Sequence, residues 1–344
     1  MKLHLLIPGL FWPETKRTEV YSDLSLPALE RILAKSHYTE SRSQAIEEWL
    51  CQAFGVSKQQ DWPVAPIMLH IDGTDAEQTR NEYWLRADPV HLRIENNHIL
   101  MADSQIFTIS LKESMQFAEI LNQYFNKSGI FFLPLYPDRW YVRINKTPNL
   151  QTRLLSETVG KNINNLLPAG EDSSIWHNIF NEIQMLLHDH QLNQEREARG
   201  ELAINSIWFW GGGIMPQVIR STFNQVWCDH AFAHALAVAS GIAHYPLPHD
   251  ATVWQHSTGP NNQLVILDTL WGKTQYKNIY EWRQSLSSLE HSWFTPLLEA
   301  MRQGKISQLT ITALNENHIR NFVMTPSSLW KFWVRTKSLS NYAK

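Results

Sequence analysis

The hydrophobic pattern of the second half of the chain alternates between two periods. Short runs such as QLVILD and QLTITAL are rich in apolar and β-favouring residues, as in strands buried on both faces. Longer segments repeat apolar residues every three or four positions, which is typical of helices with one buried face. Strands are expected at 203–210, 263–268 and 308–314, and helices at 173–190, 231–241 and 279–302. This alternation predicts a largely parallel sheet between helices.

The first half begins with a similar pattern and then changes. An apolar strand is expected at 3–7, and amphipathic helices follow at 26–35 and 43–54. The turn residues Glu95-Asn96-Asn97 then predict a hairpin. Further strands are expected at 67–72, 90–94, 98–102, 130–135 and 139–144, with a helix opened by a capping box at Ser110 and Glu113. The predicted parts are a core segment at 1–59, an α+β subdomain at 60–150 and the main α/β core at 151–344.

Composition narrows the function only slightly. The 344 residues carry a net charge of −3 with acids and bases mixed, which gives no electrostatic reason to expect a nucleic acid or an anionic membrane as partner. No apolar run approaches the roughly 18 residues of a membrane-spanning helix. Cys51 and Cys228 lie far apart without a CxxC partner. We therefore expect a soluble cytoplasmic protein without a disulfide framework, and the sequence leaves any protein partner open.

The segment 181–216 carries a family resemblance. It reads NEIQMLLHDHQLNQEREARGELAINSIWFWGGGIMP and resembles a block of archaeal-type cofactor-independent phosphoglycerate mutases, where a helix precedes a strand of the form N-x-I-W-L-W-G-x-G. With ADPVHLR at 87–93 and PDRWYVR at 137–143, the whole chain resembles the RpfE-type regulatory proteins of proteobacteria. The resemblance implies an alkaline-phosphatase-like α/β fold, a largely parallel sheet between helices with an inserted α+β subdomain.

The resemblance also indicates which metal ligands to seek. The mutases use two divalent metals that bind the phosphoryl group and activate a nucleophile. Where the family has an Asp-Gly pair after the first strand, this chain reads IPGL at 7–10. Asp268 matches an expected ligand and is a candidate catalytic residue, but no histidine follows it at 269–272, and NENH at 315–318 replaces a later Asp-His pair. The resemblance therefore implies that catalysis is lost and that no cofactor or metal is bound.

Other side chains could replace the missing ligands. His230 and His234 lie four apart on an expected helix, Asp229 is adjacent, and His318 could join Asp268. Imidazoles and carboxylates that converge on one point bind Mn²⁺ or Zn²⁺. The structural alternative is that these histidines are neutral core residues that donate hydrogen bonds to backbone carbonyls.

A small anionic ligand is the partner that the remaining polar residues suggest. A run of glycines follows an expected parallel strand at its carboxyl end, where open α/β sheets bind ligands, although it could equally form a tight turn. Arginines near the hairpins could clamp a phosphate or a carboxylate, or pair with local acids. The candidates are Gly211, Gly212, Gly213, Asn205 and Trp208 around the glycine turn, and Arg86, Arg93 and Arg139 near the hairpins.

Two functions follow from this sequence. The first is a non-catalytic regulatory or small-anion-binding protein on a degenerate phosphoglycerate-mutase-like scaffold. The second is a metal-dependent phosphoglycerate mutase, which is an isomerase, or a phosphohydrolase that uses the replacement ligands. The two differ in their metal content, because only the second needs Mn²⁺ or Zn²⁺.

Overall fold

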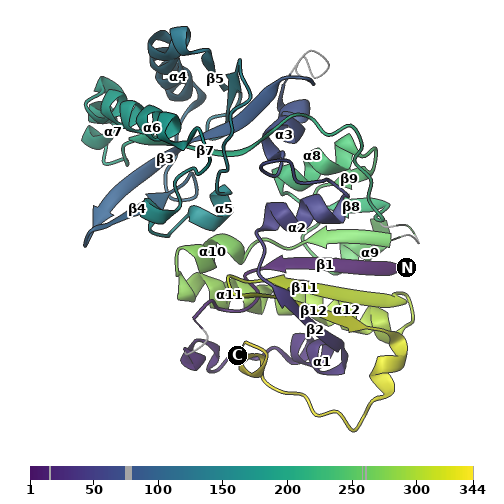
Figure 1. Cartoon of the computed structure of the whole chain (residues 1–344). Helices are drawn as coiled ribbons and strands as arrows, with labels where there is room; N and C mark the ends of the chain where they lie inside the picture. The colour runs from purple at the N-terminus through teal and green to yellow at the C-terminus, as the bar shows by residue number, and fades with distance from the viewer. Residues whose placement is uncertain (15–16, 74–79, 258, 260–261, 344) are drawn as a thin grey trace. The chain divides into compact units, whose positions relative to one another are not determined.

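The computed structural model describes residues 1–14, 17–73, 80–257, 259 and 262–343 (Figure 1). The chain divides into two compact units. The first consists of Met1–Trp49 and Ser221–Lys344, and the second of Leu50–Arg220. Helix α2 (Ile46–Ala53) contains the first boundary between them.

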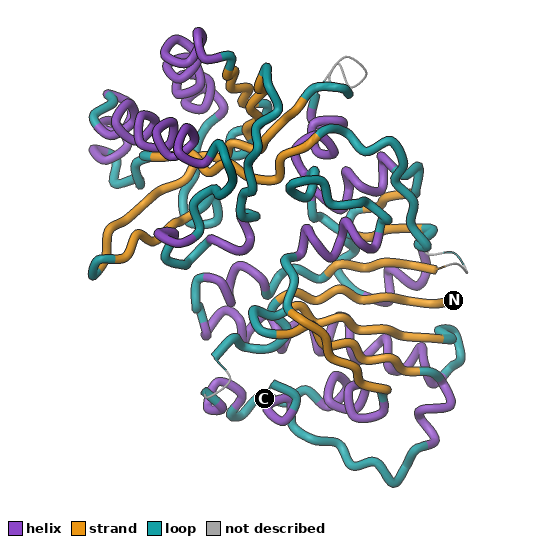
Figure 2. Tube along the Cα trace, in the orientation of Figure 1, coloured by secondary structure: helices purple, strands orange, loops and turns teal. Residues whose placement is uncertain are grey.

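The first unit is built on a seven-stranded sheet (Figure 2), and its central strands run parallel. Strand β1 lies in the middle, with β10 on one side and β11 on the other. Strands β8 and β9 extend the parallel part, whereas β12 and β2 form an antiparallel edge. The strands are β1 (Lys2–Pro8), β2 (His37–Arg42), β8 (Gln225–Trp227), β9 (Ala243–Tyr245), β10 (Asn262–Ile266), β11 (Gln308–Leu314) and β12 (His318–Met324). This largely parallel sheet confirms the expected fold class.

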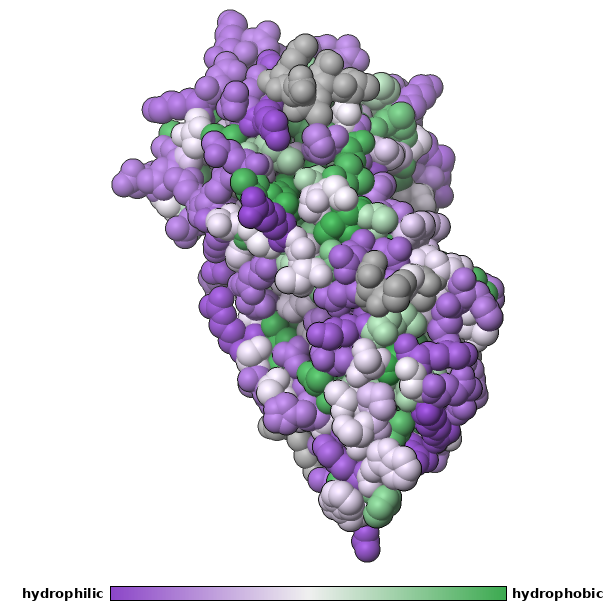
Figure 3. Space-filling model, turned by 90° about the vertical axis from the view of Figure 1, so that its right-hand side faces the viewer, coloured by the Kyte–Doolittle hydropathy of each residue, from purple (hydrophilic) through white to green (hydrophobic). Residues whose placement is uncertain are grey.

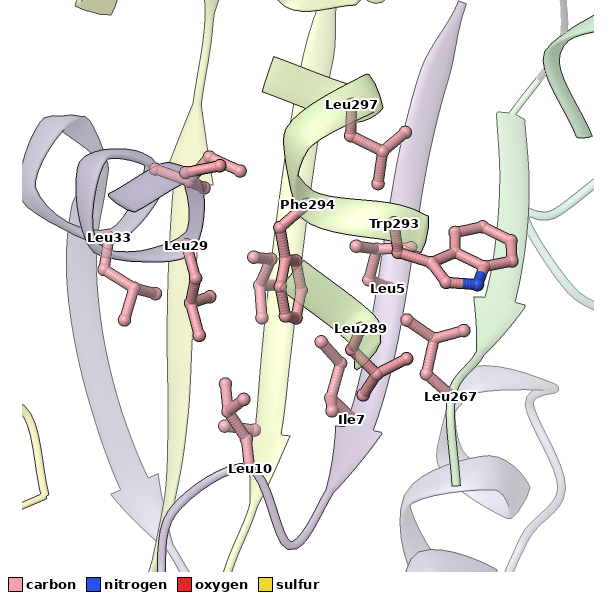
Figure 4. Close-up of a cluster of buried hydrophobic side chains, with 14 of the residues drawn as sticks. Leu5, Ile7, Leu10, Leu29, Leu33, Leu267, Leu289, Trp293, Phe294 and Leu297 are labelled. Atoms are coloured by element: carbon pink, nitrogen blue, oxygen red, sulfur yellow. The ribbon is translucent and has the colours of Figure 1, made fainter. Parts of the chain in front are cut away.

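Helices cover one face of this sheet and form the core of the unit with it (Figure 4). Leu5 and Ile7 of β1, Leu29 of α1 and Phe294 of a π-helical turn belong to one buried cluster. Burying each such side chain contributes roughly 1.5–3 kcal/mol. The helices of this unit are α1 (Pro27–Lys35), α8 (Ala231–Ala239), α9 (Ala251–Ser257), α10 (Trp271–Gln275), α11 (Ile279–Leu289), the π-helical turn Glu290–Phe294 and α12 (Thr295–Arg302), with 3-10 turns at Thr18–Tyr21, Pro326–Trp330 and Leu339–Asn341.

A buried carboxylate joins two of these helical segments. Glu290 accepts hydrogen bonds from the backbone N–H groups of Ala28 at 2.6 Å and Leu29 at 3.0 Å. The first amides of a helix have no partner within it, and α1 has no side-chain cap of its own. Glu290 therefore serves as the cap of α1 from a distant part of the sequence.

The second unit is an antiparallel sheet with helices packed on it. Its long strand β3 pairs with β4, β6 and β7, and β5 pairs with β6. Asn96 and Asn97 have positive φ angles of 48° and 65° at the expected hairpin turn, and Ser110 and Glu113 form the expected capping box. The elements are β3 (Tyr83–Glu95), β4 (His98–Ala102), β5 (Ile130–Pro134), β6 (Trp140–Ile144), β7 (Ser206–Gly213), α3 (Val64–Asp72), α4 (Leu111–Phe125), α5 (Leu155–Thr158), α6 (Ser173–His188) and α7 (Gln191–Ala198), with 3-10 turns at Asn126–Ser128 and Ile163–Asn165.

Residues 67–72 form a helix where the sequence predicted a strand. They belong to α3, and Ile67, Met68 and Leu69 are all buried. A short run that is apolar at every position shows neither a strand period nor a helix period, so local pattern does not separate the two. Packing against β3 and β7 decides in favour of the helix.

The strand expected at 203–210 is present, but its predicted place in the parallel sheet is wrong, because it belongs to the second unit. It forms β7, which runs antiparallel to β3 with Trp208 opposite Asp88. Helix α6 packs on β7 as well. The unit boundaries therefore lie after Trp49 and after Arg220, whereas the sequence placed them near residues 60 and 150.

The molecular surface carries hydrophilic and hydrophobic residues side by side. On the face in Figure 3, hydrophobic residues lie in separate patches among hydrophilic ones. Within the described parts of the chain, no helix has the length and apolar character needed to cross a membrane.

Candidate functional site

The candidate site of the first unit is the edge of the sheet where its parallel strands end. The register pairs Pro8 of β1 with Leu314 of β11, and Leu6 of β1 with Ile266 of β10. The segments that follow these strands therefore emerge at the same edge, together with the segment after Trp227 of β8. Open α/β sheets bind their ligands at this edge.

The turn after β1 is closed by packing. Gly9 adopts a positive φ of 73°, and its N–H donates to the carbonyl of Leu314 at 2.9 Å. Its carbonyl accepts a hydrogen bond from the indole N–H of Trp282 at 2.8 Å. An added Cβ at Gly9 would lie 2.8 Å from the Thr274 hydroxyl, and the next residue, Leu10, is fully buried. This turn thus presents apolar side chains and a glycine to the core, and no carboxylate to the sheet edge.

Asp268 follows β10 and lies beside His230. The Asp268 side chain is half-buried. Burial lowers the pKa of His230, although the negative charge of Asp268 opposes this effect. His230 is the N-cap of α8, and its Nδ1 accepts a hydrogen bond from the backbone N–H of Ala233 at 3.4 Å. One ring nitrogen of His230 therefore has a structural role, although it accepts from a backbone N–H and the sequence had predicted donation to a carbonyl.

The other histidine of the pair also packs within the unit. The ring of His234 stacks on that of His244, with 4.1 Å between their centroids and 22° between their planes. His244 Nε2 makes a 2.9 Å hydrogen bond to the carbonyl of Cys228. Asp229 accepts a hydrogen bond from the backbone N–H of Leu247 at 3.1 Å, which fastens the segment after β9.

Cys228 is a buried, free thiol at this edge. Its pKa is raised to about 12, chiefly by burial; the hydrogen bond to the backbone of His230 lowers the pKa, and the nearby charges of Asp268 and Asp229 contribute to the rise. Only the thiolate is an effective nucleophile. Cys228 is therefore inert as a nucleophile near neutral pH.

The five replacement ligands do not assemble into a metal centre. His318 pairs with Glu40 at 2.9 Å at the antiparallel edge. Strands β11 and β1 separate its strand from that of Asp268, which at about 4.8 Å per strand places the two roughly 14 Å apart. Among the residues that the structure describes, no three His, Cys, Asp or Glu side chains converge as metal ligands do. The donor set therefore does not fit the two divalent metals that the mutases use.

The glycine run of the second unit lies inside a strand and forms no turn. Gly211, Gly212 and Gly213 end β7 and are buried. An added Cβ would lie 2.9 Å from Val64 at Gly211 and 2.4 Å from the Tyr83 hydroxyl at Gly212. These glycines allow other parts of the same unit to approach the strand closely, so the space that a ligand would need is filled by protein.

Replacing Gly212 with alanine is expected to lower the free energy of unfolding by about 1–3 kcal/mol, because the added methyl group overpacks the core. Urea unfolding followed by circular dichroism would measure this loss. The Tyr83 hydroxyl, which is buried and has no hydrogen-bond partner among the described residues, provides a matched control. Tyr83→Phe alone should be nearly neutral, and it should recover part of the loss in the double variant. An unchanged stability of Gly212→Ala would contradict this interpretation.

The candidate arginines already have carboxylate partners. Arg86 binds Asp88 at 2.7 Å in a buried ion pair, and Arg93 binds Glu95 at 2.8 Å on the surface. Arg139 lies 3.2 Å from the carboxylate of Asp72. All three arginines thus pair with acids of the same unit, which is one of the two alternatives that the sequence left open.

The two remaining ligand candidates, Asn205 and Trp208, also make internal hydrogen bonds. Asn205 accepts from the N–H of Leu92 at 2.7 Å and donates to its carbonyl at 2.9 Å. The indole N–H of the buried Trp208 donates to the carbonyl of Arg153 at 3.0 Å. Both side chains therefore stabilise the second unit.

Three residues at the carboxyl edge escaped sequence reasoning. Trp282 and Thr274 close the turn after β1, although both are distant from it in sequence. Asn315 follows β11, and its buried side-chain oxygen accepts no hydrogen bond from any described residue. Only the position of Asn315 directly after an expected strand was a signal for it.

Comparison with known proteins adds a partial match in sequence. No protein-family model matches the chain. Over 64 residues it is 36% identical to the 2,3-bisphosphoglycerate-independent phosphoglycerate mutase of Methanothrix thermoacetophila. This stretch is 19% of the present chain and 16% of that enzyme, so the chain matches much less than two thirds of its relative.

Comparison of structures covers nearly the full chain at low identity. The PH0037 protein of Pyrococcus horikoshii matches 98% of this chain and 89% of its own, with a TM-score of 0.54 and 10% identity. The match to the cofactor-independent phosphoglycerate mutase of Thermoplasma acidophilum covers 99% of this chain and 94% of that protein, with a TM-score of 0.49 and 13% identity. The expected class is thus confirmed as a mixed α/β protein with a largely parallel sheet. More particularly, the matched stretch of 64 residues is similar in sequence to a phosphoglycerate mutase.

Proposed function

We propose that this chain is a non-catalytic regulatory protein of the RpfE type that acts in the cytoplasm. Its fold is a degenerate phosphoglycerate-mutase-like scaffold. One observation carries the proposal. The turn after β1, where the resemblance calls for a metal-binding carboxylate, is an apolar turn sealed by Trp282 and Thr274. Restoring a ligand there would require the core around Leu10 to open.

The remaining donors at this edge support the same proposal. Phosphoryl transfer with two metals needs several carboxylates and imidazoles around one point. Asp268 is available, but one nitrogen of His230 caps a helix and Asp229 holds a loop amide. A regulatory scaffold needs neither a metal nor a nucleophile at this edge.

A small anion was the partner that the sequence suggested, and we propose no anion site at the residues named for it. An incoming anion would have to displace Asp88 from Arg86, Glu95 from Arg93, or Asp72 from Arg139. The buried pair of Arg86 and Asp88 is closed to such exchange, because both side chains are almost completely buried.

A metal-dependent phosphoglycerate mutase or phosphohydrolase is the second candidate. The 36% identity to a phosphoglycerate mutase over 64 residues favours it, and so does the proximity of Asp268 to His230 at the carboxyl edge. This candidate requires uptake of Mn²⁺ or Zn²⁺ at that edge and turnover of a phosphoglycerate.

Metal analysis and a phosphoglycerate mutase assay on the purified full chain separate the two candidates. With added Mn²⁺, we expect neither stoichiometric metal nor turnover above background. The regulatory proposal fails if the protein holds stoichiometric metal and its turnover is abolished in Asp268→Ala. Asp189→Ala is the matched control, because the Asp189 side chain is 93% exposed and lies in the other unit.

A further inference from the structure

Three large aromatic side chains are exposed together near the end of the first unit. Trp330 is 74% exposed, Phe332 78% and Trp333 73%. Figures 1 and 2 show this part of the chain as a long loop that runs outside the sheet towards the C-terminus beside α1. We call residues 330–337 the aromatic strap. Large apolar groups clustered on a surface in this way mark interaction sites.

Helix α1 holds the backbone of the strap and of the turn that follows it. The ammonium group of Lys35 donates to the carbonyls of Lys331 and Val334, the second at 2.9 Å. The carboxylate of Glu30 accepts from the backbone N–H of Leu339 at 2.9 Å. Because these bonds fix the backbone, the outward direction of the aromatic side chains is part of the fold.

Two of the aromatic side chains are also ordered relative to each other. The rings of Phe332 and Trp333 lie edge to face, with 5.5 Å between their centroids and 86° between their planes. This is a favourable geometry for an aromatic pair. The pair is therefore presented to a partner in a defined arrangement, which reduces the entropy lost on binding.

The strap and its surroundings in sequence are basic. Lys331, Arg335 and Lys337 alternate with its apolar residues, and the sequence contains no Asp or Glu from Asn317 onwards. Arg335 and Lys337 are exposed. The net charge of −3 for the whole chain conceals this local excess of positive charge. An anionic surface is the complement of such a segment.

We propose that the aromatic strap attaches this protein reversibly to an anionic lipid surface. Tryptophan and phenylalanine enter the headgroup region, where an aromatic ring finds an apolar environment and the indole N–H remains hydrated. Arg335 and Lys337 contact the lipid phosphates. The irregular backbone of the strap is tolerated in this hydrated layer, although it would not be in the hydrocarbon core.

A lipid surface fits the strap better than the other partners do. It accepts protruding side chains without a matching groove, whereas a protein partner must supply pockets for them. Two copies of the chain that met through their straps would bring like charges together. The observations therefore favour lipid.

Co-sedimentation of the full chain with vesicles tests the proposal. We compare phosphatidylcholine vesicles with vesicles of phosphatidylcholine and phosphatidylglycerol, at low and high salt. Each basic residue near an anionic surface contributes about fivefold in affinity. We therefore expect the chain to bind the mixed vesicles at least about tenfold more tightly than vesicles of phosphatidylcholine alone. High salt should weaken its binding to the mixed vesicles.

Two sets of variants assign the binding to the strap. The triple variant Trp330→Ala, Phe332→Ala and Trp333→Ala should bind mixed vesicles at least about tenfold more weakly. Tyr280→Ala and Met185→Ala are matched controls, because these side chains are each 77% exposed elsewhere, and they should bind as the unmodified chain does. The double variant Arg335→Gln and Lys337→Gln tests the charge independently, and it should lower affinity for mixed vesicles without affecting the weak binding to phosphatidylcholine.

Three results would overturn the proposal. The first is equal binding to both kinds of vesicle, and the second is binding that neither set of variants weakens. The third is an absence of vesicle binding while sedimentation velocity detects self-association that the triple variant abolishes, which would assign the strap to a contact between copies. Circular dichroism checks that each variant is folded. Because the charge variant alters only exposed positions, it remains informative if the triple variant does not fold.

Discussion

Replacing Asp88 with alanine is expected to lower the free energy of unfolding of the second unit by about 3–5 kcal/mol, because it leaves a buried guanidinium without its counter-ion. Asp88 accepts hydrogen bonds from Arg86 Nη2 at 2.7 Å and Nε at 3.1 Å. It also accepts from the backbone N–H of Trp140 at 3.1 Å and the indole N–H of Trp210 at 2.7 Å. One substitution therefore removes the acceptor of four hydrogen bonds.

Without Asp88, Arg86 retains the weaker attraction of the Asp72 carboxylate and contacts with aromatic rings. Its guanidinium lies 5.2 Å from the ring centroids of both Tyr141 and Trp210, so aromatic faces surround it. Cation–π contacts add roughly 0.5–2 kcal/mol, which is less than a buried cation loses with its carboxylate.

Urea unfolding monitored by circular dichroism measures the effect of Asp88→Ala. The matched control is Glu95→Ala, which breaks the pair of Arg93 and Glu95 on the same strand. Those side chains are 66% and 47% exposed, and an exposed pair contributes about 0–1 kcal/mol. A loss below about 1 kcal/mol for Asp88→Ala would show that the buried pair does not support the sheet.

Acidification from pH 7 to pH 4 is expected to destabilise the first unit by roughly 3 kcal/mol through His4, since a pKa difference of one between the folded and unfolded states corresponds to about 1.4 kcal/mol. Burial lowers the pKa of His4 from its ordinary value of 6.5 to about 4. Below pH 6.5 the unfolded chain takes up a proton that the folded chain does not. The stabilisation is therefore complete above about pH 6.5 and is lost progressively as the pH falls to about 4.

The contacts of His4 explain why its folded form resists protonation. Its Nε2 lies 2.7 Å from the Thr312 hydroxyl oxygen, which itself donates to the side-chain oxygen of Asn321 at 2.6 Å. Nε2 is therefore the nitrogen that carries hydrogen in the neutral ring. A second proton would enter on Nδ1, while the ring packs against Trp49 and Phe223 with centroid distances of 5.3 Å and 5.6 Å.

Unfolding curves in urea between pH 4 and pH 8 test this prediction when the unmodified chain is compared with His4→Gln. The variant should lose part of the pH dependence between about 6.5 and 4, because it removes the titrating group. His291→Gln is the control, since His291 is exposed in the same unit. An identical pH dependence in the unmodified chain and in His4→Gln would contradict the assignment.

The sequence by itself determined the elements with long or continuous patterns. Strands β1, β10 and β11 are runs buried on both faces, and α1 and α11 place their apolar residues on one face. These signals are local, because burial and period are written into neighbouring residues. The short strands β8 and β9 escaped detection, since three residues are too few to show a period.

The absence of a carboxylate after β1 is likewise visible in the letters IPGL at 7–10. The residues that close that turn are not visible in the local sequence, because Trp282 and Thr274 come from a distant part of the chain. The pairing of Arg86 with Asp88 follows from their spacing along one face of a strand, which the sequence contains. The pairing of Arg139 with Asp72 requires two elements to meet.

Only the tertiary structure decided the partner of β7. The sequence SIWFWGGG reads as a fully buried strand, and burial alone does not tell whether such a strand belongs to a parallel or to an antiparallel sheet. Its hydrogen-bonding partner is β3, more than a hundred residues earlier in the chain. Local pattern fixes which residues are buried, whereas the neighbour of a buried strand depends on long-range packing. For this reason the sequence placed the strand in the wrong unit, and its glycines at the edge of the wrong sheet.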